Sequence, residues 1–161
     1  MNLLLAERPP TAADGDLLFR LYASTRAEEV AAFGWPPAMQ ESFLRMQFQA
    51  RRQSYEAAYP ESTGAILLSD GAAAGAAIVW RGPAEIRLLD IALLPEFRNR
   101  GLGTLWITGL IREACAARLP LRLSVLPGNP ASRLYERLGF VPRPSAGSLY
   151  IEMEHNGADP A

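Results

Sequence analysis

Apolar residues recur at three- and four-residue spacing in four segments of the chain, the pattern of helices that bury one face. The four helices are expected over about residues 11–24, 38–58, 104–119 and 131–138. Thr11 and Asp14 form a capping-box-like start to the first helix. Residues 26–30 either extend this helix or begin a short second turn before the glycine- and proline-containing break at 33–37.

Short apolar or alternating runs bounded by turn residues predict seven strands. They span about residues 2–7, 65–69, 73–80, 86–94, 121–125, 140–142 and 149–154. Asp70-Gly71 joins the second and third strands as a tight hairpin, because both residues tolerate positive φ. A helix separates the strands at 86–94 and 121–125, so we expect these two strands to be parallel. The sequence therefore predicts an α+β fold with a mixed sheet of six to seven strands.

The composition is typical of one ordinary globular domain. Of 161 residues, 49% are hydrophobic and 20% are charged, and the net charge is −1. We expect a single domain over 1–155 and a disordered tail over 156–161. The charge balance argues against a nucleic-acid partner. The sequence has neither a long apolar run nor a signal-type start, so no membrane partner is expected and the cytoplasm is the expected location.

One cysteine and one histidine limit the chemistry that this chain can use. Cys115 lies among apolar residues of a predicted helix, so we expect it to pack in the core rather than act as a nucleophile. His155 lies near the C-terminal end, where we do not expect a pocket that would hold it in a catalytic triad. Without a cluster of cysteines or histidines, no metal is expected.

The segment 86–104 contains the main candidate for a binding site. An apolar strand ends at Pro95, and the basic, glycine-containing turn 98–104 then leads into a helix. The first N–H groups of a helix have no intrahelical acceptor, and the helix dipole adds partial positive charge there. Glycines allow a phosphate to approach the backbone, and Arg98 and Arg100 add full charges. This turn is therefore a candidate phosphate site.

Two motifs in this chain resemble the signatures of the GNAT N-acetyltransferase family. The first is Arg98-x-x-Gly101-x-Gly103, which follows the apolar strand. The second is Asn-Pro-Ala-Ser-Arg-Leu-Tyr-Glu-Arg-Leu-Gly-Phe over residues 129–140. The order of the predicted elements matches the family along essentially the whole chain. The resemblance implies a layered α/β/α GNAT fold whose central parallel strands, 86–94 and 121–125, splay apart.

The resemblance also implies that acetyl-CoA is the cosubstrate, and it assigns residues to that role. The implied cofactor-binding residues are Ile91, Ala92, Leu93, Arg98, Asn99, Arg100, Gly101, Leu102, Gly103, Thr104, Asn129 and Arg133. The pyrophosphate would lie on the turn, and the pantetheine arm would pair with the backbone of 91–93. Backbone N–H groups near Ala92 would polarise the thioester carbonyl.

Two residues of the second motif are implied to be catalytic, and each also has a simpler interpretation. Tyr135 would protonate the leaving thiolate, because a phenol remains protonated at pH 7. A half-buried core tyrosine is the alternative. Asn129 would orient the site, but an asparagine before a proline also suits a turn or a helix cap.

The acceptor implied by the resemblance is a primary amine of a small molecule, peptide or protein, which attacks the thioester directly in a ternary complex. Its general base stays open among Asp90, Glu28, Glu85 and a chain of water molecules. Strand alternation would place Asp90 away from the thioester. The candidate substrate-binding residues are Glu28, Tyr55 and Tyr59.

Arg51 and Arg52 lie beside these tyrosines near the end of the second helix. They are either solvated charges that favour a helix C-terminus or part of the polar wall of a substrate pocket. The main alternative to an enzyme is a catalytically silent GNAT-fold domain that binds acyl-CoA as a sensor. A homodimer is a candidate assembly, because relatives are often dimers.

Overall fold

A seven-stranded mixed sheet separates two pairs of helices in the computed structural model, which describes residues 5–145 and 147–157. The strands are β1 Leu5–Arg8, β2 Thr63–Ser69, β3 Ala72–Arg81, β4 Ile86–Leu93, β5 Leu121–Val125, β6 Val141–Arg143 and β7 Ile151–His155. Their order in the sheet is β1-β2-β3-β4-β5-β7-β6. Only β4 and β5 are parallel neighbours among these strands, and the other pairs are antiparallel. The predicted mixed sheet with a central parallel pair is confirmed.

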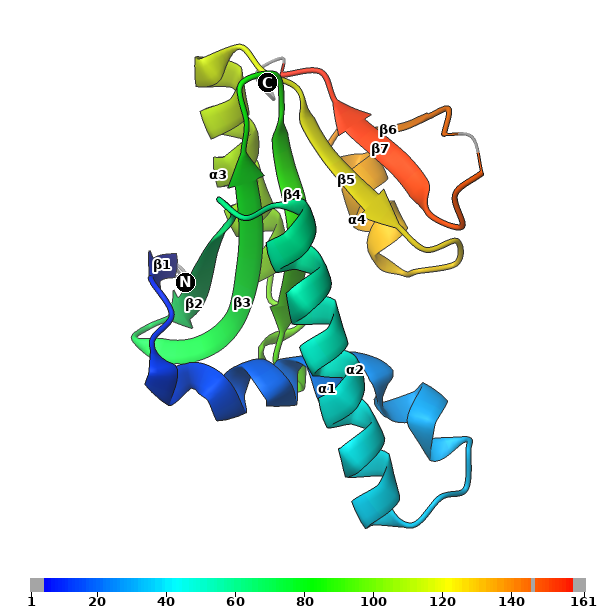
Figure 1. Cartoon of the computed structure of the whole chain (residues 1–161). Helices are drawn as coiled ribbons and strands as arrows, with labels where there is room; N and C mark the ends of the chain where they lie inside the picture. Colours follow the sequence, from blue (N-terminus) through cyan, green and yellow to red (C-terminus); the bar gives the residue numbers. More distant parts are fainter. Residues whose placement is uncertain (1–4, 146, 158–161) are drawn as a thin grey trace.

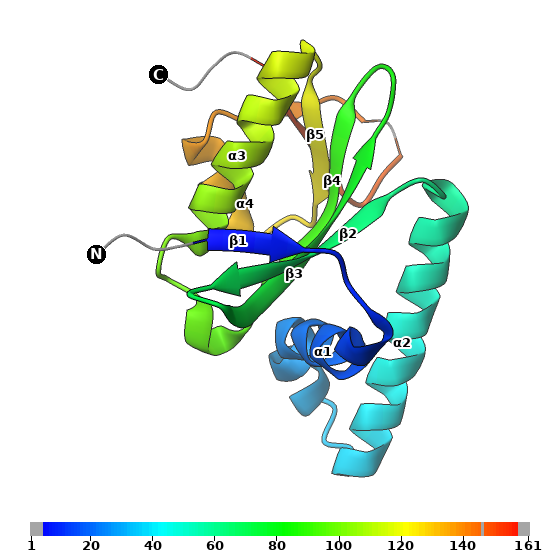
Figure 2. The same ribbon diagram turned by 90° about the vertical axis from the view of Figure 1, so that its left-hand side faces the viewer.

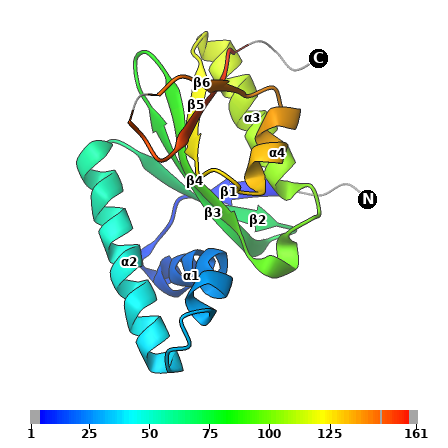
Figure 3. The ribbon, with the colours of Figure 1, turned by 90° about the vertical axis from the view of Figure 1, so that its right-hand side faces the viewer.

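Two helices cover each face of the sheet. The helices are α1 Gly15–Ala31, α2 Pro37–Ala58, α3 Leu102–Ala117 and α4 Ala131–Arg137. In Figure 2, α1 and α2 lie on one side of the sheet, and α3 and α4 lie on the other. The opposite view in Figure 3 has the same arrangement. This α/β/α layering leaves an interior on both sides of the sheet.

The main hydrophobic core lies between the sheet and α3. Ile107 and Ile111 are one turn apart on α3, and both are completely buried. They pack in one cluster with Leu121 of β5 and with Phe140. A second, smaller core joins α1 to α2 through buried residues that include Phe19, Tyr22, Val30 and Leu44. The α1–α2 layer therefore carries its own core and sits over the sheet as a separate cover.

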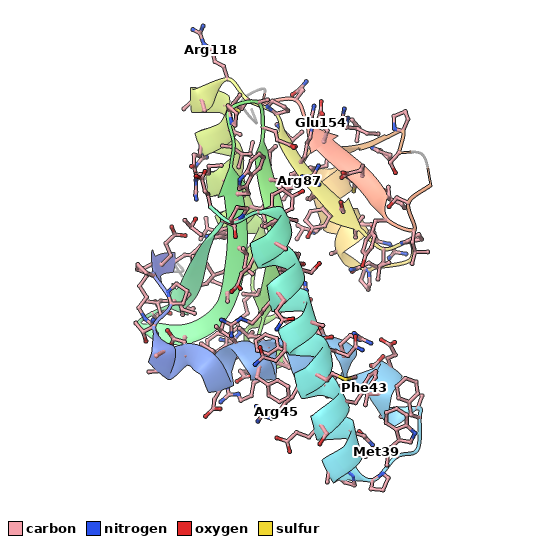
Figure 4. All side chains as sticks on the ribbon, in the orientation of Figure 1. Met39, Phe43, Arg45, Arg87, Arg118 and Glu154 are labelled. Atoms are coloured by element: carbon pink, nitrogen blue, oxygen red, sulfur yellow. The ribbon has the colours of Figure 1, made fainter. Side chains whose placement is uncertain are left out.

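The α1–α2 layer differs from the sequence prediction mainly in the length of α1. This helix continues to Ala31, so residues 26–30 extend it rather than begin a new turn. The second helix begins at Pro37, where a missing N–H costs nothing. The N-terminal half of α2, which carries Met39 and Phe43, projects beyond the sheet (Figures 1 and 4).

A β-bulge in β4 decides which face of the sheet its later side chains occupy. Ile78 of β3 pairs with Asp90, whereas the next residue of β3, Val79, pairs with Leu88, so Leu89 has no partner on β3. An extra residue in one strand reverses the alternation of side chains beyond it. Ile86 and Leu88 lie in the α3-side core, and after the bulge Ile91 and Leu93 pack against that core. Asp90 and Ala92 therefore belong to the α1–α2 face.

Strands β4 and β5 pair at their beginnings and then separate. The paired residues are Ile86 with Leu121, Arg87 with Arg122 and Leu88 with Leu123, and no later pair joins the two strands within the described chain. Figure 1 shows them diverging toward their carboxyl ends, with α4 beneath the open side of β5. The predicted splay is confirmed, and beyond Leu88 one edge of β4 is not paired with another strand.

The remaining differences concern element ends and the C-terminal region. Strand β6 starts one residue later than predicted, and β7 begins at Ile151 rather than Leu149. His155 ends β7 and is 5% exposed, with its ring 5.5 Å from that of Phe140. The single histidine is thus a core residue. Residues 2–4 of the first predicted strand and 158–161 of the predicted tail lie outside the described residues.

Candidate active site

The turn between β4 and α3 presents the start of a long helix to the open side of the sheet. Asn99 has φ of 60° and Gly101 has φ of 81°, so the turn needs two left-handed residues. The N–H of Leu105 bonds the carbonyl of Gly101 and closes the first turn of α3. The N–H groups of residues 102–104 precede this bond and have no acceptor within the helix. This geometry suits an anion at the α3 N-terminus.

Arg98, the first residue of the motif, has a role that its position in the sequence did not indicate. Its Nε donates to the carbonyl of Leu93 at 3.0 Å, and one Nη donates to Ser24 Oγ at 3.0 Å. The guanidinium thereby joins the turn 98–104 to the end of β4 and to α1. Arg100 lies over the ring of Phe97 at 5.6 Å. The charges of both arginines remain close to the turn.

The strand segment 91–93 lies where the sequence places the pantetheine arm. Ile91 and Leu93 point their side chains into the α3-side core, and Ala92 lines a cavity on the other face. Opposite them in β3 is Gly75, where an added Cβ would lie 2.3 Å from the carbonyl oxygen of Ala92. Glycine is therefore required at 75 to let β3 approach this stretch of β4.

Tyr135 lies on α4 and belongs to the core on the α3 side of the sheet. It is 7% exposed and packs edge-on against Phe140, with ring centroids 5.7 Å apart. Within the described chain its hydroxyl has no hydrogen-bond partner. Burial, and secondly the negative charge of Asp90, raise the pKa of Tyr135 to about 12. The phenol therefore stays protonated at neutral pH.

Asn129 and Arg133, the other predicted residues near α4, are both exposed. The side-chain oxygen of Asn129 accepts the N–H of Ala131 at 2.9 Å, and its backbone carbonyl accepts the N–H of Ser132 at 3.0 Å. Asn129 thus forms a turn over Pro130 directly before α4, which is the turn role of its alternative interpretation. This turn leads into the helix that carries Tyr135.

A cavity of about 490 Å³ lies between the sheet and the α1–α2 layer. Its walls include apolar residues of both helices, small residues of β2 and β3, and a group of polar side chains. The polar and charged residues in the lining are Thr25, Arg51, Arg52, Tyr55, Glu56, Ser62 and Asp90. The arginines near the end of α2 therefore form part of a pocket wall, rather than only favouring the helix terminus.

An ion pair crosses this cavity from α2 to β4. Arg51 Nη2 donates to Asp90 Oδ1 at 2.6 Å, and Arg51 Nε donates to the hydroxyl of Tyr55 at 3.1 Å. That hydroxyl donates in turn to the carbonyl of Leu89, the bulge residue, at 3.1 Å. Burial raises the pKa of Asp90, although Arg51 opposes this shift. Burial likewise raises the pKa of Tyr55.

A second ionic cluster holds the closed end of the gap. Arg87 makes two hydrogen bonds to Glu152 of β7, at 2.9 and 3.1 Å, and donates to Ser124 of β5 at 3.3 Å. Figure 4 labels Arg87 where β4 and β5 lie close together. Glu85 is 3.5 Å from both Arg87 and Arg122. Glu85, a candidate base, is therefore paired at the closed end rather than in the cavity.

Two of the three predicted substrate residues lie outside the cavity lining. Glu28 is exposed on α1, and Tyr59 packs beside Trp80 with ring centroids 5.3 Å apart. Tyr55 lines the cavity. Asp90, which strand alternation had placed away from the site, also lines it because of the bulge. Sequence periodicity does not reveal a bulge, since an extra residue changes no local composition.

Residues 5–145 and 147–157 contain no group of three or more His, Cys, Asp or Glu side chains arranged to hold a metal. None of the four helices is long and apolar enough to cross a membrane. Cys115 is half-buried at the edge of the α3-side core.

Comparisons with known proteins agree with this geometry. The family model described as the acetyltransferase (GNAT) family matches residues 23–140. A Bacillus subtilis (strain 168) protein, named a putative ribosomal protein bS18-alanine N-acetyltransferase, is 32% identical over 97 residues. This match spans 58% of the chain and 62% of that protein.

Solved structures of acetyltransferases share the fold. PaiA N-acetyltransferase from Thermoplasma acidophilum, solved in complex with coenzyme A, superposes with a TM-score of 0.67 at 18% identity, over 95% of this chain and 99% of that one. A histone acetyltransferase HPA2-related protein from Corynebacterium glutamicum superposes with a TM-score of 0.65 at 22% identity, over 99% of each chain. At these identities the likeness concerns the fold.

Proposed function

We propose that this chain, which belongs to the GNAT family, is an N-acetyltransferase that transfers the acetyl group of acetyl-CoA directly to a primary amine in a ternary complex. The observation that carries the proposal is the open gap between β4 and β5. The start of α3, which suits an anion, follows β4, and Tyr135 and Asp90 belong to opposite faces of the sheet. The gap and its surroundings thus offer a place for the pyrophosphate, the pantetheine arm and the thioester of acetyl-CoA.

The residues of the gap fit acetyl-CoA. The α3 N-terminus offers unpaired N–H groups to a pyrophosphate. The unpaired edge of β4 offers backbone donors and acceptors to the two amides of the pantetheine arm, as an added strand would. Bound there, acetyl-CoA supplies an activated acyl group as a thioester. We assign Arg98 to holding the turn against β4 and α1, in addition to its charge near the phosphates.

Two side chains have the properties that the proton transfers require. Tyr135 is protonated at neutral pH and has no competing partner in the described chain, so it can donate a proton to the departing thiolate. Asp90 lines the acceptor cavity, and burial raises the pKa of its carboxyl toward the range useful for a base. We therefore propose Asp90, rather than Glu28 or Glu85, as the group that takes the ammonium proton.

A two-part experiment tests this function. Purified protein is titrated with acetyl-CoA by calorimetry, and release of free thiol is then followed across a panel of primary amines. The proposal expects saturable binding and amine-dependent thiol release, with the acetylated amine identified by mass spectrometry. Absence of binding at micromolar acetyl-CoA contradicts the proposal. Binding without thiol release on the whole panel would instead favour a silent acyl-CoA sensor.

A further inference from the structure

The acceptor cavity has its charged groups on one side and apolar side chains around the rest. Arg51, Asp90 and Tyr55 lie together where α2 faces β4. The side chains of Arg51 and Asp90 are 34% and 30% exposed, so a ligand in the cavity can reach both. The apolar lining includes Leu18, Leu21, Phe48 and Ile78. The cavity therefore suits a ligand with a charged head and an apolar body.

The charged head must match an ion pair rather than a single charge. A lone ammonium near Asp90 would also meet the guanidinium of Arg51, whose position is fixed by Tyr55 and by the ring of Tyr22 at 5.5 Å. A ligand that carries both charges avoids this repulsion. Its ammonium faces Asp90 while its carboxylate faces Arg51. The Nη1 of Arg51 has no hydrogen-bond partner in the described part of the chain and is available to that carboxylate.

We propose that the acceptor is a free α-amino acid with an apolar side chain, bound as a zwitterion by Asp90 and Arg51. This inference rests on the proposed acetyl transfer. An α-amino acid carries its ammonium and its carboxylate on the same carbon atom. The two groups can therefore face Asp90 and Arg51, which are themselves in contact, while the side chain extends along the apolar walls. A peptide N-terminus has the ammonium but a neutral amide in place of the carboxylate, so the charge of Arg51 would lack a counterpart.

The space for the side chain comes from small residues on the strands. Gly64, Ala65 and Ala76 all line the cavity. A larger residue at 76 would occupy volume that now remains between the sheet and α1, whereas a Cβ at Gly64 would lie 2.9 Å from the side chain of Pro10, which also lines the cavity. A volume of about 490 Å³ falls in the range typical of small-molecule sites. The sheet composition thus favours an acceptor whose apolar part is substantial.

The reaction balances with the residues present. The ammonium gives a proton to Asp90, and the neutral nitrogen forms a bond to the acyl carbon while the carbon–sulfur bond breaks. Tyr135 gives its proton to the sulfur, so coenzyme A leaves as a thiol. The nitrogen, now bonded to the acyl carbon, loses its second proton, which returns through water to Tyr135. The proton on Asp90 leaves to solvent, so the overall reaction releases one proton. The product amide has no ammonium and no longer pairs with Asp90, which favours its release.

The test compares acceptors that differ only in the carboxylate. L-leucine, L-leucinamide and 3-methylbutylamine share one apolar body, and a peptide with an N-terminal alanine represents protein substrates. We expect kcat/KM for leucine to exceed that for leucinamide by about tenfold or more, the effect of one charge-assisted hydrogen bond. Binding to the protein–coenzyme A complex is also measured at pH 7, where both α-amino groups are mainly protonated. We expect leucine to bind this complex more tightly than leucinamide does.

Two substitutions then test whether Arg51 causes the preference for leucine over leucinamide. Arg51→Met should bring the leucine-to-leucinamide ratio close to one, whereas Arg45→Met should leave it unchanged. Arg45 lies on the same helix, is 53% exposed and is absent from the cavity lining. Equal or better use of leucinamide, 3-methylbutylamine or the peptide by the unaltered protein would overturn the inference. It would leave acetyl transfer intact, whereas no thiol release with any acceptor would count against the proposed function itself.

Discussion

At the residue scale, Tyr135 has the environment of an acid that keeps its proton. Burial and the charge of Asp90 both disfavour the phenolate, so the hydroxyl is protonated throughout the physiological range. Tyr135→Phe removes the proton and keeps the ring that packs on Phe140. We expect turnover to fall by about 10²- to 10⁴-fold, with little change in acetyl-CoA affinity. Steady-state kinetics and calorimetry measure the two quantities, and unchanged turnover would reject the acid role.

Asp90 should control the acidic side of the pH–rate profile. Its carboxyl must be ionised to accept a proton, and burial raises its pKa above the ordinary value near 4. Activity should therefore fall as the pH decreases through this raised pKa. Asp90→Asn should lower kcat/KM and abolish this limb, so that only the ionisation of the amine shapes the profile. An acidic limb at the same pH in the variant as in the unaltered protein would assign the base to another group.

The sequence could not predict these roles completely, for reasons specific to each residue. The position of Tyr135 on a short helix was predictable, because it lies inside a complete motif, and its role as the acid stays a prediction. Asp90 was placed on the wrong face, since the bulge at Leu89 reverses the alternation. The hydrogen bonds of Arg98 to Ser24 and of Arg51 to Asp90 join residues distant along the chain. Such pairs leave no local sequence pattern, and only the packing of α1 and α2 reveals them.

At the element scale, the close approach of β3 to β4 depends on one glycine. A Cβ at position 75 would lie 2.3 Å from the carbonyl oxygen of Ala92, so Gly75→Ala must displace β4 where the thioester is proposed to bind. We expect a loss of about 1–3 kcal/mol in the free energy of unfolding, as for other overpacked sites, and weaker acetyl-CoA binding. Chemical denaturation and calorimetry measure these effects.

Gly109 provides the matched control for this substitution. It lies within α3, and an added Cβ there would have nothing within 4 Å. Gly109→Ala should stabilise the protein by roughly 0.5–1 kcal/mol, because alanine loses less backbone freedom in a helix. Its acetyl-CoA affinity should not change. Equal effects of the two alanines would show that the approach of β3 to β4 is not the limiting contact.

The junction of β1 and α1 depends on the buried carboxylate of Asp14. Two nitrogens of Arg8 bond it at 2.8 and 2.9 Å, and the N–H of Thr11 donates to it at 2.7 Å. These bonds, those of Arg8 foremost, hold the pKa of Asp14 well below its usual range. A lowered pKa in the folded state adds stability that is present above about pH 4 and is lost as the pH falls further.

Asp14→Asn should therefore lower the melting temperature at pH 7. The difference from the unaltered protein should shrink as the pH decreases from 5 toward 2, because the Asp14 carboxyl of the unfolded chain then takes up a proton that the folded state, with its lowered pKa, does not. Thermal unfolding at several pH values measures this difference. A difference independent of pH would mean that the asparagine acts through packing rather than through the lost charge.

The elements themselves were largely predictable from periodicity. In the described part of the chain, seven strands and four helices occur close to where the apolar patterns place them. Strand β6 is the exception in its packing, since all three of its residues are exposed. The ends were less certain: α1 continues to Ala31 even though its sequence there is mostly polar. That extension is stabilised by tertiary contacts, since Val30 is 1% exposed in the core between α1 and α2.

At the scale of the whole molecule, the proposed reaction uses residues from both faces of the sheet. The α3 side contributes the helix start and Tyr135, and the α1–α2 side contributes the cavity with Asp90 and Arg51. In the proposed reaction, the substrate amine and the thioester meet at the gap between β4 and β5. This position is the one at which open α/β sheets usually bind ligands, beyond the carboxyl ends of adjacent parallel strands. The sequence predicted the gap through its motifs, but it did not predict the cavity, which depends on how the α1–α2 layer sits over the sheet.

Binding of acyl-CoA in the gap between β4 and β5 is the central claim of the proposed function. Amide hydrogen exchange, measured with and without coenzyme A, tests this claim directly. We predict slower exchange in two segments, residues 90–93 of β4 and 101–104 at the start of α3, since the pantetheine arm and the pyrophosphate would pair with their N–H groups. Protection confined to other parts of the chain, with these two segments unchanged at saturating coenzyme A, would contradict the account.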